Sequence, residues 1–157
     1  MRELKELTAG LDAPALIMQL GPFVLVQRPF VPQPRAMHRT VTAPLGKRPS
    51  STVDFEDLWV LTLPPVRESD SFVIGRGAEC DVVIDEKTVS SQHARIDWSK
   101  GDATLTDLKS SNGTLINGTP AKADLPQRVQ DNDAIDFGAV RVLFLKVETF
   151  LKRMGRR

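Results

Sequence analysis

Residues 93–108 have the sequence HARIDWSKGDATLTDL, and this stretch carries the clearest indication of secondary structure in the chain. Apolar and polar side chains alternate from His93 to Trp98, as they do in a strand with one buried face. Lys100-Gly101-Asp102 is a turn signal, and the second β-branched run ATLTDL follows it at once. The stretch therefore predicts two antiparallel strands joined by a tight turn.

The same pattern of short apolar runs and turn residues continues on both sides of this pair. Short apolar runs recur from Leu58 onward at about ten-residue spacing, and turn signals such as Ser111-Asn112-Gly113 and Asn117-Gly118 separate them. No helix of three turns fits between these runs. We therefore predict an all-β domain, an antiparallel β-sandwich of about ten to eleven short strands. The runs are LWVLTL, SFVIG, DVVI, HARIDW, ATLTDL, GTLI, DAIDFG and VRVLFLKV.

Composition divides the chain into four segments. Residues 1–27 are predicted to form an N-terminal arm, in which RELKELTAGL favours a short helix and PFVLVQ a strand, packed on the main domain or on another protein. Residues 28–54 contain five prolines and too few apolar side chains to offset chain entropy, which predicts a Pro-rich flexible linker. Residues 55–147 form the folded domain. Residues 148–157 are a basic C-terminal tail, either a short helix or a frayed end.

Charge and aromatic content argue against a nucleic-acid or membrane partner. The formal net charge is +1 in 157 residues, so no strong overall field attracts polyanions. The charges are uneven, however: residues 1–50 carry seven Lys and Arg against three Asp and Glu, whereas residues 51–157 carry fourteen against seventeen. Seven Phe, two Trp and no Tyr do not suggest stacking platforms for single-stranded nucleic acid.

The few thiol and imidazole groups predict neither a disulfide nor a metal site. Cys80 is the one cysteine, and with His38 and His93 it lacks the spacing of zinc ligands. The longest apolar run, ALIMQLGPFVLVQ, is broken by Gly21-Pro22 and is shorter than a membrane span. We therefore expect a cytoplasmic protein without metal, cofactor, signal peptide or membrane anchor.

Three short motifs occur in a fixed order within the predicted sandwich: Gly75-Arg76, Ser90-x-x-His93 and Asn112-Gly113. Together with the segment DLKSSNGTLING, they resemble the forkhead-associated (FHA) domain, a phosphothreonine-binding module, over about residues 58–147. The resemblance implies an FHA-type sandwich and partners that carry phosphothreonine, such as kinase substrates. It also implies a preference for phosphothreonine over phosphoserine, because a small pocket receives the threonine methyl group.

The residue types of the first motif suit phosphate recognition. A phosphorylated hydroxyl carries nearly two negative charges and three acceptor oxygens, so its receptor needs a fixed cation and neutral donors. The planar guanidinium of Arg76 can donate bidentate, charge-assisted hydrogen bonds to such a group. Gly75 allows the chain to turn sharply out of its strand, so that Arg76 sits on the rim of the domain.

The remaining roles come from the resemblance. It implies that Ser90 and Ser111 also bind the phosphate. It further implies that the side-chain amide of Asn112 binds the peptide backbone beside the phosphorylated residue. His93 would pin the recognition loops, and Gly113 and Asn117 would be turn residues. Two positions depart from the family's usual pattern. Ser91, which we count with the site-supporting residues, stands where a basic residue is common, and Ser111 stands where threonine is common.

Two other functions fit parts of the pattern. A phospho-independent scaffold would use the sandwich together with PFVLVQ as its contact, although it would have no reason to keep Arg76, Ser90 and Asn112. A hydrolase would use Ser90 with His93 and an aspartate, but the G-x-S-x-G elbow is absent. Within the binding hypothesis, a phosphothreonine on the linker could occupy the site in cis. Candidate hydroxyls there are Thr40, Thr42, Ser50, Ser51 and Thr52.

Overall fold

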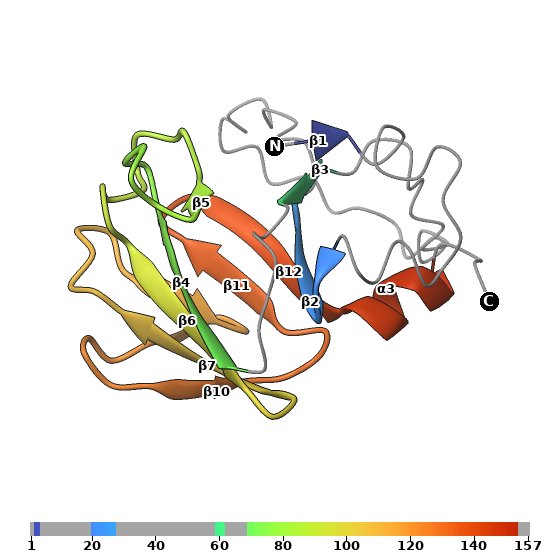
Figure 1. Cartoon of the computed structure of the whole chain (residues 1–157). Coiled ribbons are helices and arrows are strands. Elements are labelled where there is room, and N and C mark those ends of the chain that lie inside the picture. Colours follow the sequence, from blue (N-terminus) through green and yellow to red (C-terminus); the bar gives the residue numbers. More distant parts are fainter. Residues whose placement is uncertain (1, 4–19, 28–58, 62–68, 154–157) are drawn as a thin grey trace, which may run out of the picture.

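The computed structural model describes residues 2–3, 20–27, 59–61 and 69–153, which form twelve strands and a C-terminal helix (Figure 1). The elements are β1 (Arg2–Glu3), β2 (Phe23–Gln27), β3 (Trp59–Leu61), β4 (Ser69–Gly75), β5 (Val82–Val83), β6 (Ala94–Ser99), β7 (Asp102–Asp107), β8 (Thr114–Ile116), β9 (Thr119–Pro120), β10 (Gln127–Val129), β11 (Ala134–Phe137), β12 (Val140–Lys146) and α3 (Val147–Arg153). The predicted arm helix RELKELTAGL is wrong at its first two residues, because Arg2 and Glu3 pair with β3 as strand β1. The rest of that segment and the Pro-rich segment 28–54 lie outside the described residues.

The strands form two sheets. One has seven strands in the order β1-β3-β2-β12-β11-β8-β9, and the other has five in the order β10-β7-β6-β4-β5. The β4–β5 pair is parallel, and the other strand pairs are antiparallel. Figure 1 shows the two sheets as separate layers. The predicted all-β sandwich is therefore confirmed.

Glycine and asparagine shape the turns that the sequence indicated. Ser99 pairs with Asp102, and the two residues between them have positive φ, 52° at Lys100 and 87° at Gly101. This combination matches the right-handed twist of a two-residue hairpin, as predicted. Asn117 and Gly118, with φ of 51° and 80°, join β8 to β9 in the same way.

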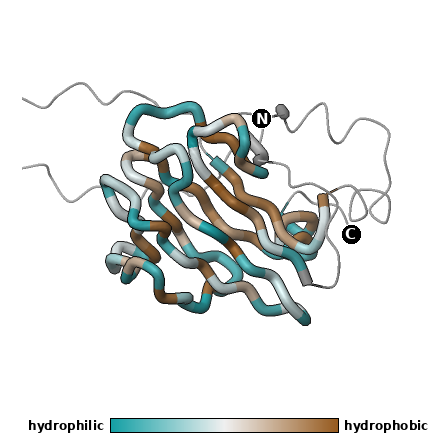
Figure 2. The backbone as a smooth tube through the Cα atoms, turned by 60° about the vertical axis from the view of Figure 1, so that its left-hand side comes forward, coloured by the Kyte–Doolittle hydropathy of each residue, from teal (hydrophilic) through white to brown (hydrophobic). Residues whose placement is uncertain are grey.

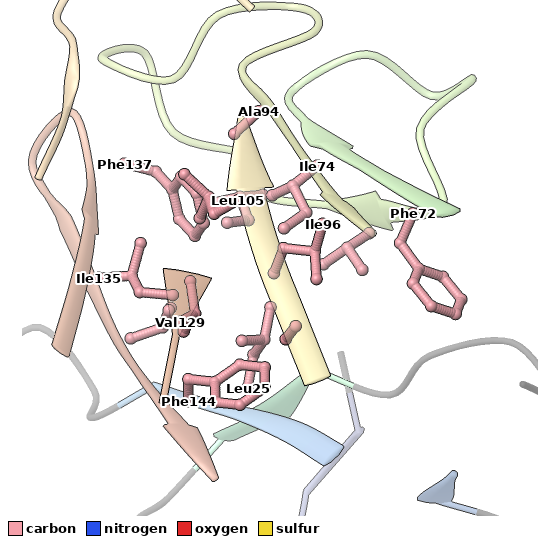
Figure 3. Packing of buried hydrophobic residues seen from close by; sticks show 14 of the residues in the cluster. Leu25, Phe72, Ile74, Ala94, Ile96, Leu105, Val129, Ile135, Phe137 and Phe144 are labelled. Atoms are coloured by element: carbon pink, nitrogen blue, oxygen red, sulfur yellow. The ribbon is translucent and has the colours of Figure 1, made fainter. Parts of the chain in front are cut away.

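The main core lies between the two sheets and alternates along each strand. In β6 the burial pattern is buried, exposed, buried, half-buried, buried, exposed. Figure 2 shows the corresponding change between hydrophobic and hydrophilic residues along the chain, and Figure 3 shows buried side chains from both sheets meeting. Trp98 and Phe137 belong to this cluster. Its largest fully buried members are Phe23, Phe72, Phe137, Phe144, Leu25, Ile74, Ile84, Ile96 and Leu105.

Strand β2 is an internal strand of the seven-stranded sheet. It pairs with β12 on one side and β3 on the other, so PFVLVQ forms a strand as predicted and lies inside the sheet. Phe23 and Leu25 are fully buried in the core between the sheets. Phe23 stacks on Phe144 at a ring-centroid distance of 4.8 Å and meets Phe72 edge-on at 5.9 Å.

The opposite face of β2 is also buried. Val24 and Val26 alternate with the core residues, so they point to the outer side of the sheet, and their exposed fractions are 0% and 5%. Helix α3 contacts both β2 and β12 and buries Phe150 and Leu151. Residues 147–153 are therefore helical and packed. Within the residues that the structure describes, no helix is long and apolar enough to cross a membrane.

Candidate functional site at one end of the sandwich

Three loops are bonded together where β4, β5 and β7 end. They are the β4–β5 loop, the β5–β6 loop and the β7–β8 loop, and we call them the recognition loops. The backbone N–H of Arg76 donates to the carbonyl of Ser90 at 2.9 Å, and the N–H of Gly77 donates to the carbonyl of Ser91 at 2.9 Å. The sequence motifs, which are far apart along the chain, are thus brought to one place.

Arg76 follows the last residue of β4 and is exposed. Its backbone is held by Ser90, but no described residue forms an ion pair or hydrogen bond with its guanidinium. The five N–H donors of the guanidinium are therefore available to form hydrogen bonds with a ligand from solution.

Ser90 and Ser111 are in direct contact. The Ser90 hydroxyl oxygen accepts the backbone N–H of Ser111 at 3.0 Å. Because this bond occupies an acceptor site of the oxygen, the hydroxyl hydrogen remains available to a ligand. The hydroxyl of Ser111 is exposed and has no partner among the described residues. Two residues that each carry a small hydroxyl group thus lie side by side in neighbouring loops.

His93 is fully buried and joins two of the loops through its ring. Its Nδ1 accepts the backbone N–H of Ser90 at 3.0 Å, so the neutral ring carries its hydrogen on Nε2, which donates to the carbonyl of Gly113 at 3.0 Å. Burial lowers the pKa of His93 below its usual range, although the Gly113 carbonyl and the Asp107 carboxylate act in the opposite direction. The imidazole is therefore held neutral, with both nitrogens occupied.

Asn112 is exposed, and its side chain reaches across to the β5–β6 loop. Its Nδ2 donates to the carbonyl of Thr88 at 2.7 Å. A carbonyl can only accept, so this contact fixes the orientation of the amide. One N–H and the Oδ1 atom remain, which are the donor and the acceptor that a peptide unit requires.

A buried carboxylate shapes the β7–β8 loop. Asp107 accepts the Ser110 hydroxyl and the Thr114 hydroxyl, both at 2.6 Å, and the Ser110 backbone N–H at 3.1 Å. Burial by itself would raise the pKa of Asp107, but the bonds from Ser110 and Thr114 outweigh it and lower the pKa. The carboxylate thus organises the turn that presents the next two residues, Ser111 and Asn112.

Gly75 is required by a close approach of two backbone segments. A Cβ at this position would lie 2.2 Å from the Ser91 carbonyl oxygen and 2.9 Å from the sulfur of Cys80. The Cys80 thiol donates to the same carbonyl at 3.0 Å, and burial raises its pKa. Ser91 therefore supports the site through its backbone, whereas its side chain is exposed.

Asn117 lies at the other end of β8 from Gly113. Its Nδ2 donates to Asp133, and its Oδ1 accepts the backbone N–H of Ala134 at 2.9 Å. These bonds tie the β8–β9 turn to the start of β11, and they do not reach the recognition loops. The other eight predicted site residues lie in or beside those loops.

Sequence reasoning did not single out Thr88 and Gly138. Thr88 accepts the Asn112 amide, and Gly138 donates its N–H to the Gly113 carbonyl at 3.2 Å. The only local signals were a small polar residue just before Val89-Ser90 and a glycine after the predicted strand DAIDF. Among the described residues, no cluster of three or more His, Cys, Asp or Glu is placed to hold a metal ion.

The two-sheet sandwich and the polar loops at one end define the class of protein: a small β-sandwich domain whose binding site is formed by loops. Residues 72–138 match the family model of the FHA domain. The chain therefore contains an FHA domain, and the resemblance inferred from the motifs is confirmed.

The relatives include two proteins whose names describe an inhibitor and a regulator. The chain is 38% identical over 71 residues to the oxoglutarate dehydrogenase inhibitor of Corynebacterium glutamicum, which is 45% of this chain and 48% of that protein. It is 31% identical over 71 residues to the glycogen accumulation regulator GarA of Mycolicibacterium smegmatis, which is 45% of this chain and 43% of that protein. The chain thus spans about half the length of the curated relatives it matches.

Solved structures support the fold. The FHA domain of the CT664 protein from Chlamydia trachomatis has a TM-score of 0.53 at 16% identity, and the match covers 80% of this chain and 98% of that one. The N-terminal FHA domain of Saccharomyces cerevisiae Rad53p, solved with a phosphothreonine peptide, has a TM-score of 0.50 at 21% identity over 59% of this chain and 88% of that one.

Proposed function

We propose that the chain is a phosphothreonine-binding adaptor that recruits phosphorylated partner proteins in Ser/Thr-kinase signalling. The observation that carries the proposal is the convergence of three residues: the Arg76 guanidinium has no partner among the described residues, the Arg76 N–H is bonded to the Ser90 carbonyl, and the Ser90 hydroxyl accepts the N–H of Ser111. A cation with five donors and two neutral donors match the charge and the acceptor oxygens of a phosphate.

Asn112 would supply the peptide contact. Its free N–H and Oδ1 can bond to the carbonyl and the N–H of one peptide unit next to the phosphorylated residue. This contact would be independent of the phosphate, and so it would align the peptide without supplying the selectivity for phosphorylation. The threonine methyl group adds about 1 kcal/mol when buried, which gives a preference over phosphoserine and not an exclusion.

The test is a set of three matched peptides that contain phosphothreonine, phosphoserine or threonine at the same position. Fluorescence anisotropy should detect the phosphothreonine peptide with the highest affinity and the threonine peptide not at all. Equal binding of all three peptides would refute the proposal. An oriented phosphopeptide library would then define the preferred neighbouring residues.

The structure bears on the two alternatives. The scaffold hypothesis uses PFVLVQ as a contact, yet Phe23, Val24, Leu25 and Val26 are all buried within the fold. The hydrolase hypothesis needs an imidazole that can accept the Ser90 hydroxyl proton. Both ring nitrogens of His93 are occupied by backbone groups, so neither can act as that base. Both observations favour the adaptor.

A phosphothreonine in segment 28–54 would be an intramolecular competitor for the same site. Along the chain this segment lies between β2 and β3, which are paired in one sheet, and a flexible tether within the same chain gives millimolar effective concentration. Kinase treatment that phosphorylates the segment should weaken binding of an external phosphopeptide. If phosphorylated and untreated protein bind that peptide equally, this part of the proposal fails. The cytoplasm, where kinases act and Cys80 stays reduced, is the proposed location.

A further inference from the structure

The turn between β11 and β12 carries none of the predicted site residues, yet it is bonded to two recognition loops. The N–H of Gly138 donates to the carbonyl of Gly113 at 3.2 Å, and the N–H of the next residue, Ala139, donates to the Thr88 hydroxyl oxygen at 2.9 Å. We call Gly138-Ala139 the clamp turn. Its two consecutive donors hold the β7–β8 loop and the β5–β6 loop at a fixed separation.

Thr88 connects the clamp turn to the proposed peptide contact. Its side-chain oxygen accepts Ala139, and its carbonyl oxygen accepts the Asn112 amide at 2.7 Å. The position of the Asn112 amide is therefore set by the Thr88 backbone, and the position of that backbone is set in turn by the hydroxyl. One half-buried threonine thus links three segments of chain.

The clamp turn is packed against Thr88 without spare room. A Cβ at Gly138 would lie 2.5 Å from the Thr88 carbonyl oxygen and 2.9 Å from its hydroxyl oxygen, and φ is +59° at Gly138. Two separate reasons, the left-handed backbone and the close contact, exclude a side chain here. The carbonyl that a Cβ would displace is the one that holds Asn112.

From these contacts we infer that Thr88 is a positioning residue for the ligand and that Gly138 allows it to act. Thr88 touches no phosphate in this scheme. It orients the Asn112 amide so that the remaining N–H and Oδ1 face a bound peptide. The inference rests on the proposed function, since it assigns the peptide contact to Asn112, but the placement of the amide can be tested without any ligand.

The first experiment measures the side-chain amide resonances of Asn112 by NMR in the full chain without ligand. Thr88→Val removes the hydroxyl while keeping the shape, and it should shift these resonances. Thr88→Ser retains the hydroxyl and should leave them close to the wild-type positions. Thr104→Val, on the outward side of β7, is the matched control and should also leave them unchanged. Unchanged Asn112 resonances in Thr88→Val would overturn the inference.

The second experiment measures the affinity of a phosphothreonine peptide. Thr88→Val should weaken binding about tenfold, since one oriented hydrogen bond is lost, while Thr88→Ser should stay within about twofold of wild type. In an Asn112→Ala background, Thr88→Val should cause little further loss, because the group that it positions is gone. Independent, additive losses would contradict the inference.

Gly138→Ala tests the close packing. It should weaken peptide binding and shift the Asn112 resonances. Gly101→Ala has a similar backbone conformation, with φ of +87°, but nothing lies within 4 Å of its added Cβ, so it controls for strain alone. Equal effects of the two substitutions on the Asn112 resonances would overturn the role of Gly138. If wild type binds no phosphopeptide, the proposed function fails and the ligand-free NMR result alone decides the inference.

Discussion

The imidazole of His93 accepts the backbone N–H of Ser90 at its Nδ1 atom, at a distance of 3.0 Å. The bond can exist only while that nitrogen is unprotonated. The same ring donates from Nε2 to Gly113 in the neighbouring loop. Two of the three recognition loops are thus joined by a single neutral side chain, and its protonation state has consequences for stability.

The stability of the domain should fall as His93 becomes protonated. Burial lowers the pKa of His93 in the folded chain, so the unfolded chain, with an ordinary value of about 6.5, binds the proton more readily. The contribution is complete above about pH 6.5 and is lost as the pH falls from there toward the lowered folded value. Urea denaturation at pH 7.5 and pH 5.5 measures it.

The controls for this prediction use the two histidines of the chain. His93→Ala should reduce the free energy of unfolding by about 2 to 4 kcal/mol at pH 7.5 and should remove most of the difference between the two pH values. His38→Ala should leave that difference intact. If His38→Ala, and not His93→Ala, abolishes it, the assignment is wrong.

Replacement of Arg76 should affect binding and not stability. Arg76→Ala removes the guanidinium that is proposed to bind the phosphate. Each charge-assisted hydrogen bond contributes about 1.5 to 3 kcal/mol, so affinity for the phosphothreonine peptide should fall at least tenfold. Arg76→Lys keeps the charge but loses the fork, and it should bind with intermediate affinity. The side chain is exposed, so the melting temperature should not change. Arg95→Ala, an exposed arginine paired with Asp97, should leave peptide affinity unchanged.

Gly75→Ala should distort the base of the Arg76 loop. The added methyl would meet the Ser91 carbonyl oxygen, which belongs to the backbone and cannot rotate away. Overpacking of this kind costs about 1 to 3 kcal/mol. A thermal melt and a peptide titration should both show damage. Adding Cys80→Ala removes the sulfur contact but not the carbonyl contact, so the double variant should not recover. Full recovery would show that the sulfur, and not the backbone, is the obstacle.

Phe23→Ala should destabilise the whole domain. The ring is fully buried and lies 4.8 Å from Phe144 and 5.2 Å from Trp98, centroid to centroid. Loss of a buried phenylalanine costs about 3 to 5 kcal/mol. Chemical denaturation measures this cost, and Leu125→Ala, at a position 53% exposed, serves as the control. An unchanged denaturation midpoint in Phe23→Ala would contradict the role of this ring in the core.

Alternation and turn chemistry predicted the strands that have both signals. HARIDW and ATLTDL became β6 and β7 because each has a two-residue period and they share a Lys100-Gly101 turn with positive φ. Asn132, in the turn before β11, has φ of 76°, a conformation that asparagine tolerates better than most residues. Strand β10 was missed because Gln127–Val129 contains one buried apolar side chain, too few to show a period.

The position of β2 had no local signal. PFVLVQ has four consecutive apolar residues, which indicates a strand buried on both faces. The sequence of a strand does not, however, indicate which other strands it pairs with. Its partner β12 lies near the other end of the sequence. The contact between Asn112 and Thr88 had no sequence signal either. Asn112 donates to the backbone carbonyl of Thr88, and any residue at position 88 would supply that atom.

The pairing of β2 with β12 also bears on how the protein is made. A ribosome releases the early strand long before its partner has been translated, so Phe23 and Leu25 must remain without their final neighbours during most of synthesis. Until β12 emerges, these apolar side chains are available to chaperones or to improper association. The seven-stranded sheet can therefore be completed only late in synthesis, after β12 has been translated.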